Sequence, residues 1–313
     1  MPSSNGQIIA RAAVNTGSLS GGGILAPEQA RKFIQQTFEA TTLSPLVRHE
    51  MRTSTTGEID KIGIASRIVR AKAENTDDDY RAGVKTSQIK YATTAVRLPW
   101  EVTEETLRQN IEGQNLENII TNLMTTQLGV DMEDLYLNGD SEIAAKTGGS
   151  DTPDYDFLKI NDGWIKQIKK GGHVIDASSQ SGMSLDLFYN AVKALPNKYN
   201  NGKLRWLMSP HRKQEWELFL MNQVIGKGGA VPDSVYQSPA GIPSVSVPSL
   251  DDGTIILTDP QNLIVVNSYN VIIRKTTEGK EAVMMDKRFY VIHLDFDPII
   301  EETDATGIIT GLK

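Results

Sequence analysis

The sequence lacks cysteine and is poor in aromatic residues. Its 313 residues include no Cys, and Phe, Trp and Tyr together make up only 6%. The absence of Cys excludes a disulfide framework, thiolate metal sites and a cysteine nucleophile, and it fits a reducing compartment. No apolar run is long enough to cross a bilayer, and nothing near the N-terminus resembles a signal peptide. We therefore expect a soluble protein that acts in a cytoplasm, with no membrane partner.

Motifs of enzymes and metal sites are also missing. The sequence contains no Walker motif, no Gly-x-Ser-x-Gly and no dinucleotide-binding fingerprint. None of the four histidines has the spacing of a zinc ligand pair; they are His49, His173, His211 and His293. Two acidic groups lack the twelve-residue pattern of a calcium loop: Asp77-Asp78-Asp79 and Asp151/Asp154/Asp156. We expect no catalytic residue, no cofactor and no metal ion, and hence no enzyme.

One enzymatic alternative stays open. Asp295 and Asp297 form an Asp-x-Asp pair after the apolar residues 290–292, an arrangement that supplies the nucleophile and the acid/base in haloacid dehalogenase-like phosphatases. Two features argue against it. Ile299 stands where that motif usually has Thr or Val, and only 16 residues follow Asp297, too few for the α/β domain of that family. The alternative is a metal-dependent phosphohydrolase using Asp295 and Asp297.

What the composition does contain is typical of a folded protein. Apolar residues make up 39% and charged residues 23%, so general disorder is not expected. The length suits one large or two ordinary domains. The formal net charge of −7 argues against a surface built to grip nucleic acid.

The N-terminal part of the chain predicts an arm. Residues 2–23 are rich in Ser, Gly and Asn and end in three glycines, without the Gly-Lys-Ser/Thr of a phosphate loop. A short helix is predicted from Pro27, and Ser44-Pro45 ends it.

Residues 57–100 predict a long β-hairpin with an acidic tip at 74–79. Apolar residues mark the outgoing arm (Ile59, Ile62, Ile64, Ile68 and Val69) and the returning arm (Ile89, Tyr91, Val96, Leu98 and Trp100). Basic residues flank the tip: Arg67, Arg70, Lys72, Arg81, Lys85 and Lys90. An isolated ribbon is marginally stable in water, so this one gains stability by lying across something else. It is either a solvated hairpin of mixed charge or a loop that docks on a neighbouring subunit.

The next segment predicts the longest helix of the chain. Apolar residues recur every three or four positions over about six turns, roughly 30 Å. They are Leu116, Ile119, Ile120, Leu123, Met124, Leu128, Met132, Leu135 and Tyr136. Asn138-Gly139 follows directly and predicts a left-handed C-terminal cap. This turn therefore reads as the end of a structural helix and not as a phosphate or metal site.

The remaining residues alternate irregularly between helix and strand patterns. We predict helices around Trp164, over 185–195 and from Ser209-Pro210. We predict short strands at 204–208, 242–247, 254–258, 263–267 and 270–274, and a final extended stretch over 281–297. The irregular order indicates an α+β fold and not a doubly wound sheet.

Five short motifs, in order along the chain, resemble those of tailed-bacteriophage major capsid proteins with the Hong Kong 97-type fold. They are Gly22-Gly23-Ile24-Leu25-Ala26-Pro27, Thr55-Thr56-Gly57-Glu58-Ile59, Leu137-Asn138-Gly139-Asp140, Trp206-Leu207-Met208-Ser209-Pro210 and Gly241-Ile242-Pro243-Ser244-Val245. Each motif alone is weak, but together they cover nearly the whole chain.

The resemblance implies a domain division. Residues 1–48 would form an N-terminal arm and 49–100 the extended loop. The peripheral domain would hold 101–178 and 271–313, with a spine helix at 115–137, and the axial domain would hold 179–270.

The resemblance also implies function and partners. The chain would assemble with itself into pentamers and hexamers of an icosahedral head that encloses double-stranded DNA without sequence specificity. It would be assembled in the host bacterial cytoplasm and found in the virion. Its arm is too short for a built-in scaffolding segment, so we expect a separate scaffolding protein, besides a portal protein and, as a further candidate, a decoration protein. An encapsulin-like compartment shell shares the fold and remains an alternative.

Two sets of residues carry this hypothesis. The predicted assembly interface is Arg67, Arg70, Lys72, Glu74, Asp77, Asp78, Asp79, Arg81 and Lys85. The predicted packing positions of the spine helix are Leu116, Ile120, Leu123, Leu128, Met132 and Leu135.

Overall fold

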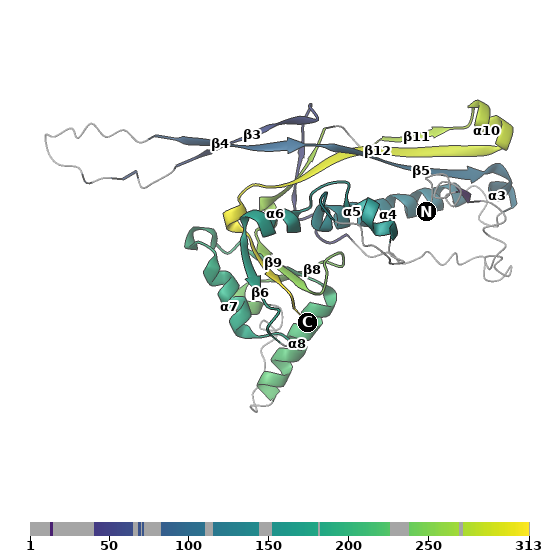
Figure 1. The fold of residues 1–313 in the computed structure, drawn as a ribbon. Helices are drawn as coiled ribbons and strands as arrows, with labels where there is room; N and C mark the ends of the chain where they lie inside the picture. Colours follow the sequence, from purple (N-terminus) through teal and green to yellow (C-terminus); the bar gives the residue numbers. More distant parts are fainter. Residues whose placement is uncertain are drawn as a thin grey trace.

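The computed structural model describes residues 13–14, 41–64, 68–69, 71, 83–109, 115–143, 152–180, 182–225, 238–268 and 272–312. The described chain has an α+β fold with three sheets. Figure 1 shows a long upper layer of strands with a hairpin projecting from one end, a long helix beneath that layer, and a separate lobe below. The predicted helix near Pro27 and the predicted acidic hairpin tip lie outside the described residues.

The upper layer is a six-stranded sheet around one long strand, β12. Its strands are β1 (Ala13–Val14), β2 (Arg48–Met51), β5 (Thr94–Thr103), β10 (Leu263–Asn267), β11 (Ile272–Thr276) and β12 (Lys287–Ile300). Strand β12 pairs antiparallel with β5 along ten residues, and with β11 and β10 over its first and second halves. Most apolar residues of β12 are buried, while Phe289 and Val291 are half-buried.

Helix α4 (Asn115–Asn138) packs against this sheet, as the apolar stripe predicts. Its neighbours are α5 (Thr152–Leu158) and α6 (Trp164–Gly171), and α3 (Glu104–Gln109) precedes it in the chain and contacts β5. The shared core contains two aromatic contacts of Tyr136, with Trp164 at 5.7 Å and with Phe296 at 5.5 Å between ring centroids. Trp100 and Tyr290 stack at 5.1 Å further along the same core.

The lower lobe is a five-stranded sheet covered by two helices. Its strands, in spatial order, are β6 (His173–Asp176), β13 (Gly307–Thr310), β9 (Thr254–Thr258), β7 (Arg205–Met208) and β8 (Ser244–Ser246). The helices are α7 (Leu185–Ala194) and α8 (Pro210–Ile225). Phe188 of α7 makes edge-to-face contacts with Trp206 and Trp216, each at 4.9 Å between centroids, which joins both helices to the sheet.

The predicted hairpin is shorter than the pattern indicated. Strands β3 (Thr56–Gly63) and β4 (Lys85–Ala92) pair as a two-stranded sheet of their own. The second half of the predicted returning arm instead forms β5 and pairs with β12, so that part of the prediction is wrong. The reason is burial: Trp100 and Val102 lie in the main core, which holds β5 more firmly than a ribbon would.

The C-terminal end of α4 also differs from the prediction. Gly139 does not have a positive φ, so the predicted left-handed cap is wrong. A Cβ at Gly139 would lie 2.4 Å from the Asn161 carbonyl oxygen, and one at Gly163 would lie 2.6 Å from that of Leu137. The Gly163 amide donates to the Gly139 carbonyl at 2.7 Å. Glycine is therefore needed here for a close backbone approach between α4 and the start of α6.

Further segments differ from what the sequence predicted. Residues 281–285, expected to be extended, lie in the short helix α10 (Lys280–Met285), and Asp286 follows in the left-handed conformation. The lower sheet includes β6 and β13, although the predicted division places their residues in the other domain. Conversely, β10 lies in the upper sheet although its residues were assigned to the axial domain. The chain therefore crosses between the two lobes more often than the predicted boundaries imply.

Candidate assembly surfaces

The distal part of the β3–β4 hairpin exposes apolar residues. Ile62, Ile64 and Val84 are exposed by 77%, 61% and 65%. Lys85, the first residue of β4, is exposed beside them and pairs with Gly63. Exposed apolar side chains on the outer part of the described ribbon are typical of a surface that another molecule covers.

Most of the predicted assembly residues lie outside the described ranges, so their role stays a prediction. They are Arg67, Arg70, Lys72, Glu74, Asp77, Asp78, Asp79 and Arg81. Sequence reasoning concentrated on these charges and gave less weight to the exposed isoleucines, although the same pattern contains them.

The base of the hairpin rests on the body of the molecule. Ile59 and Tyr91 are buried in a small apolar cluster with Ile264, Val266 and Ile299. A Cβ at Gly57 would lie 2.6 Å from the Tyr91 hydroxyl oxygen, so only glycine lets this ring lie against β3.

A lysine two residues beyond Ile59 in β3 adds a polar attachment. Lys61 donates to the Glu301 carbonyl oxygen at 2.6 Å and forms an ion pair with Glu302 at 2.6 Å. Arg48 of β2 pairs with the Glu301 carboxylate at 2.6 Å, which fixes the backbone that receives Lys61. The hairpin is thus attached to the body as far along β3 as Lys61, whereas Ile62, Ile64 and Val84 beyond it are exposed.

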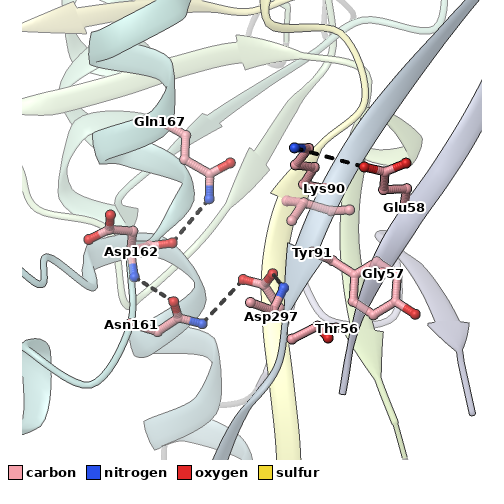
Figure 2. Close-up of a pocket in the computed structure, with 11 residues that line it drawn as sticks. Thr56, Gly57, Glu58, Lys90, Tyr91, Asn161, Asp162, Gln167 and Asp297 are labelled. Atoms are coloured by element: carbon pink, nitrogen blue, oxygen red, sulfur yellow. Dashed lines mark hydrogen bonds and ion pairs between the residues drawn. The ribbon is translucent and has the colours of Figure 1, made fainter. Parts of the chain in front are cut away.

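A cavity of about 620 Å³ lies between the hairpin base and the start of α6. Figure 2 shows Asn161, Asp162 and Gln167 on one side, Glu58, Lys90 and Tyr91 on the other, and Asp297 between them. The Asp297 carboxylate accepts from the Ala92 amide at 2.7 Å and from the Asn161 side chain at 3.4 Å. Burial raises the pKa of this carboxyl group.

The predicted spine residues lie along α4. Leu116, Ile120, Met132 and Leu135 are buried in the main core, Leu128 is partly buried against it, and Leu123 is half-buried. Their burial is a structural finding, whereas their role in a shell stays a prediction.

Sequence reasoning missed a buried carboxylate on the same helix. Glu133 is only 2% exposed, and it accepts from the backbone amides of Leu43 and Ser44 at 3.1 and 3.2 Å. Burial raises the pKa of Glu133, and the backbone donors oppose that effect. Thr42 donates to the Ser246 carbonyl oxygen of β8 at 2.7 Å, so residues 42–44 are tied to both α4 and the lower sheet. The signal in the sequence that could have revealed this buried carboxylate is a Glu among the apolar residues of the helix.

A second exposed apolar surface lies at the opposite end of the upper layer. Val283, Met284 and Met285 of α10 are more than half exposed, and in Figure 1 this helix lies at the end away from the hairpin. The sequence offered a signal, since Gly279 precedes a run of residues with adequate helix propensity.

A charged network stabilises the sheet near α10. Arg288 of β12 pairs with Glu104 of α3 and Glu117 of α4, and Lys287 pairs with Glu101 at 2.9 Å. The Arg288 guanidinium lowers the pKa of Glu104. The network joins two helices to β12 beneath the exposed surface.

The geometry does not support the phosphohydrolase alternative. Asp295 is 2% exposed, and its two carboxylate oxygens accept from the Ser268 amide at 2.9 Å and from the Ser268 hydroxyl. Asp297 is engaged by Ala92 and Asn161, as described above. In the described ranges, no three His, Asp or Glu side chains come together as a metal site requires.

Among the described helices, none combines the length and the apolar character that a membrane span requires.

We compared the chain with known proteins to find those with a similar sequence and fold. No family model matches the chain. Over 325 aligned residues it is 29% identical to the putative prophage capsid protein YqbE of Bacillus subtilis (strain 168), and the alignment covers 99% of each protein.

Solved structures resemble this chain over nearly its full length. A chain of the satellite phage P4 procapsid, a structure that includes the size determination (Sid) protein, superimposes with a TM-score of 0.64 at 14% identity. That match covers 99% of this chain and 98% of the other. The capsid of an empty GTA particle gives a TM-score of 0.64 at 10% identity, covering 96% and 100%. Gordonia phage Cozz gives 0.59 at 14% identity, covering 93% of both.

These comparisons define the class: the chain has the fold of phage capsid proteins. The α+β class and the resemblance to the Hong Kong 97-type fold, both predicted from the sequence, are confirmed.

Proposed function

We propose that the chain is the major capsid protein of a tailed double-stranded DNA bacteriophage. It assembles with itself into the shell of the virion, and its role is structural and not catalytic. The observation that carries the proposal is the full-length match to a capsid protein and to capsid structures, in a chain whose hairpin has no interior of its own.

The exposed surfaces support self-assembly. The hairpin and α10 lie at opposite ends of one layer, and both present apolar residues to solvent. Contacts between unlike surfaces of identical chains generate rings or lattices. Pentamers and hexamers of an icosahedral head are the arrangement that this fold implies.

The domain division is part of the proposal. Residues 1–48 serve as the N-terminal arm, and the hairpin β3–β4 is the core of the extended loop. The upper sheet with α4 forms the peripheral domain. The lower sheet with α7 and α8 forms the axial domain, and we include β6 and β13 in it because they pair within that sheet.

Three kinds of partner complete the proposal. A separate scaffolding protein directs assembly in the host cytoplasm, a portal protein occupies one vertex, and packaged DNA fills the shell without sequence-specific contacts. The net charge of −7 fits a container that does not hold its genome tightly.

Electron microscopy of the chain expressed with the scaffolding protein of its phage tests the proposal. We expect closed shells from the wild type. The double change Ile62→Asp and Ile64→Asp should abolish shells and leave a folded subunit, because it places charge on the exposed end of the hairpin.

Thr86→Asp is the matched control, since it adds a charge at an exposed polar position of the same ribbon. It should reduce assembly much less. A wild-type chain that stays monomeric with its scaffold would contradict the proposal, and shells filled with a cargo enzyme instead of DNA would favour the encapsulin-like alternative.

A further inference from the structure

An Asn-Gly pair lies in an exposed turn of the lower lobe. Asn201 and Gly202 connect the short helix η1 (Asn197–Tyr199) to strand β7, and both residues are exposed. Gly202 has a φ of +83°, in the left-handed region that favours glycine. A Cβ at this position would meet nothing within 4 Å, so the space beside the Gly202 backbone is open.

An asparagine followed by a glycine has a reactivity of its own. The backbone nitrogen of the glycine attacks the side-chain carbonyl carbon of the asparagine, because both groups belong to one chain and glycine has no side chain that obstructs the approach. The nitrogen loses its proton, ammonia leaves, and a five-membered succinimide ring forms. Water then opens the ring at either of its carbonyl groups. The products are Asp and isoaspartate, in which the chain continues through the side-chain carboxyl group.

The turn stabilises the charge that develops during this attack. The side-chain oxygen of Asn201 accepts from the Lys203 amide at 3.1 Å. This oxygen gains negative charge when the nitrogen attacks its carbon, and a backbone N–H directed at it stabilises that charge. In the described part of the chain, the Gly202 amide itself donates to no acceptor, so no hydrogen bond has to break before the nitrogen reacts.

The Asn-Gly pair at the end of α4 is held in a way that blocks the same reaction. The Asn138 side-chain amide donates to the Asp134 carboxylate at 2.6 Å and to the Ser249 carbonyl oxygen at 2.7 Å. The Gly139 amide donates to the Leu135 carbonyl oxygen at 3.2 Å, and Gly139 is buried. The end of the helix would have to open before the Gly139 nitrogen could attack.

We propose that Asn201 is a site of spontaneous deamidation, and that the fold directs the reaction to Asn201 and away from Asn138. The reaction converts a neutral amide into a carboxylate, and in isoaspartate it also lengthens the backbone by a methylene group. The new charge would face a cavity of about 240 Å³ whose lining already includes Asp259, Glu301 and Glu302. This chemistry belongs to the single chain and does not depend on shell assembly.

Peptide mapping by mass spectrometry, after incubation of the purified full-length chain at mildly alkaline pH, tests this assignment. We expect the mass increase of an amide-to-acid change at Asn201, with isoaspartate and Asp both present. Asn200 is the internal control, because the residue that follows it has a side chain, and it should stay an amide. Asn138 should react more slowly than Asn201 by about tenfold or more, because the helix end must open first.

Unfolding the chain provides the matched control. In guanidinium chloride, Asn138 and Asn201 are both followed by a glycine in an open chain, so they should deamidate at similar rates. For Asn201 that rate should be close to the rate in the folded chain, whereas for Asn138 it should be much higher. Mapping by peptide separates both positions from the third Asn-Gly pair, Asn5-Gly6, which lies outside the described residues.

A substitution at the attacking residue tests the route. Gly202→Ala adds a methyl group beside the attacking nitrogen and should slow the reaction at Asn201 by about tenfold or more. Far-UV circular dichroism verifies that this variant stays folded.

Three results would overturn the proposal. In the first, Asn201 stays an amide in the folded chain while it reacts in guanidinium chloride. In the second, Asn138 and Asn201 react equally fast in the folded chain, which would mean that the fold does not select between them. In the third, the product at Asn201 contains Asp but no isoaspartate, which would exclude the succinimide.

Discussion

Helix α4 and the β3–β4 hairpin are both long elements, yet they are stabilised in different ways. Helix α4 has buried apolar residues at both ends, from Leu116 to Leu137, in a core shared with the upper sheet. The hairpin buries only Ile59 and Tyr91, both near its base. The body is therefore complete within one chain, whereas the hairpin has stability to gain from a neighbour.

Truncating a core side chain should give the largest difference in unfolding free energy between the body and the hairpin. Trp164→Ala removes a fully buried indole whose N–H donates to the Ile299 carbonyl oxygen at 3.1 Å. We expect it to lower the free energy of unfolding by about 3–5 kcal/mol. Ile62→Ala on the hairpin should change it by no more than about 0.5 kcal/mol. Urea unfolding of the isolated chain measures both changes in free energy. A comparable loss of stability for Ile62→Ala would contradict the difference between the body and the hairpin.

The buried carboxylate of the body should have the next largest effect. Glu133→Ala leaves the Leu43 and Ser44 amides without their acceptor, at a cost of about 2–4 kcal/mol in unfolding free energy. Glu133→Gln keeps one acceptor oxygen and removes the buried charge, so it should cost clearly less. Urea unfolding near neutral pH compares the two. Equal costs for Ala and Gln would show that these hydrogen bonds are not what stabilises residues 42–44.

Two glycine substitutions test the same difference in stability between the body and the hairpin. Gly139→Ala places a methyl group 2.4 Å from the Asn161 carbonyl oxygen and should destabilise the body by about 1–3 kcal/mol. A Cβ at Gly63 of the hairpin meets nothing within 4 Å, so Gly63→Ala should be neutral or slightly stabilising. Thermal unfolding monitored by circular dichroism distinguishes them, and a neutral Gly139→Ala would contradict the close backbone approach.

The smallest expected effect is electrostatic. Arg288→Ala breaks the pairs with Glu104 and Glu117, which are partly exposed, and should cost about 1 kcal/mol near neutral pH. Because Arg288 lowers the pKa of Glu104 in the folded state, this contribution is present above the unfolded pKa and is lost as the pH falls through the folded one. The difference in unfolding free energy between wild type and variant should therefore shrink as the pH falls below the unfolded pKa of Glu104. A constant difference across this range would exclude the carboxylate as the cause.

The sequence was sufficient to predict a helix where a clear local signal coincides with a continuous core. The apolar stripe of α4 runs from Leu116 to Tyr136, and the helix extends over Asn115–Asn138. The Ser209-Pro210 signal marks the start of α8, where the Arg212 amide donates to the Ser209 hydroxyl at 3.2 Å. In both cases local propensity and burial agree.

The failures occur where tertiary contacts override a local signal. Asn138-Gly139 has the composition of a left-handed cap, but Gly139 serves a close approach to residue 161, which is distant in sequence. The apolar residues of the returning arm fall on odd positions at 89 and 91 and on even positions from 96 to 100. This break in the alternation lies close to Thr93, where β4 ends and β5 begins to pair with β12, and the prediction of one continuous arm overlooked it. The hydrogen bonds of Glu133 and Asp297 depend on long-range pairing that one sequence does not display.

Hydrogen exchange of the hairpin, in the isolated chain and in assembled shells, tests the central claim most directly. We expect amides of 56–63 and 85–92 to exchange rapidly in the isolated chain and to slow by about 100-fold or more in the shell. Amides of α4 and β12 should be protected in both states. Equal protection of the hairpin in the isolated chain and in the shell would contradict the account.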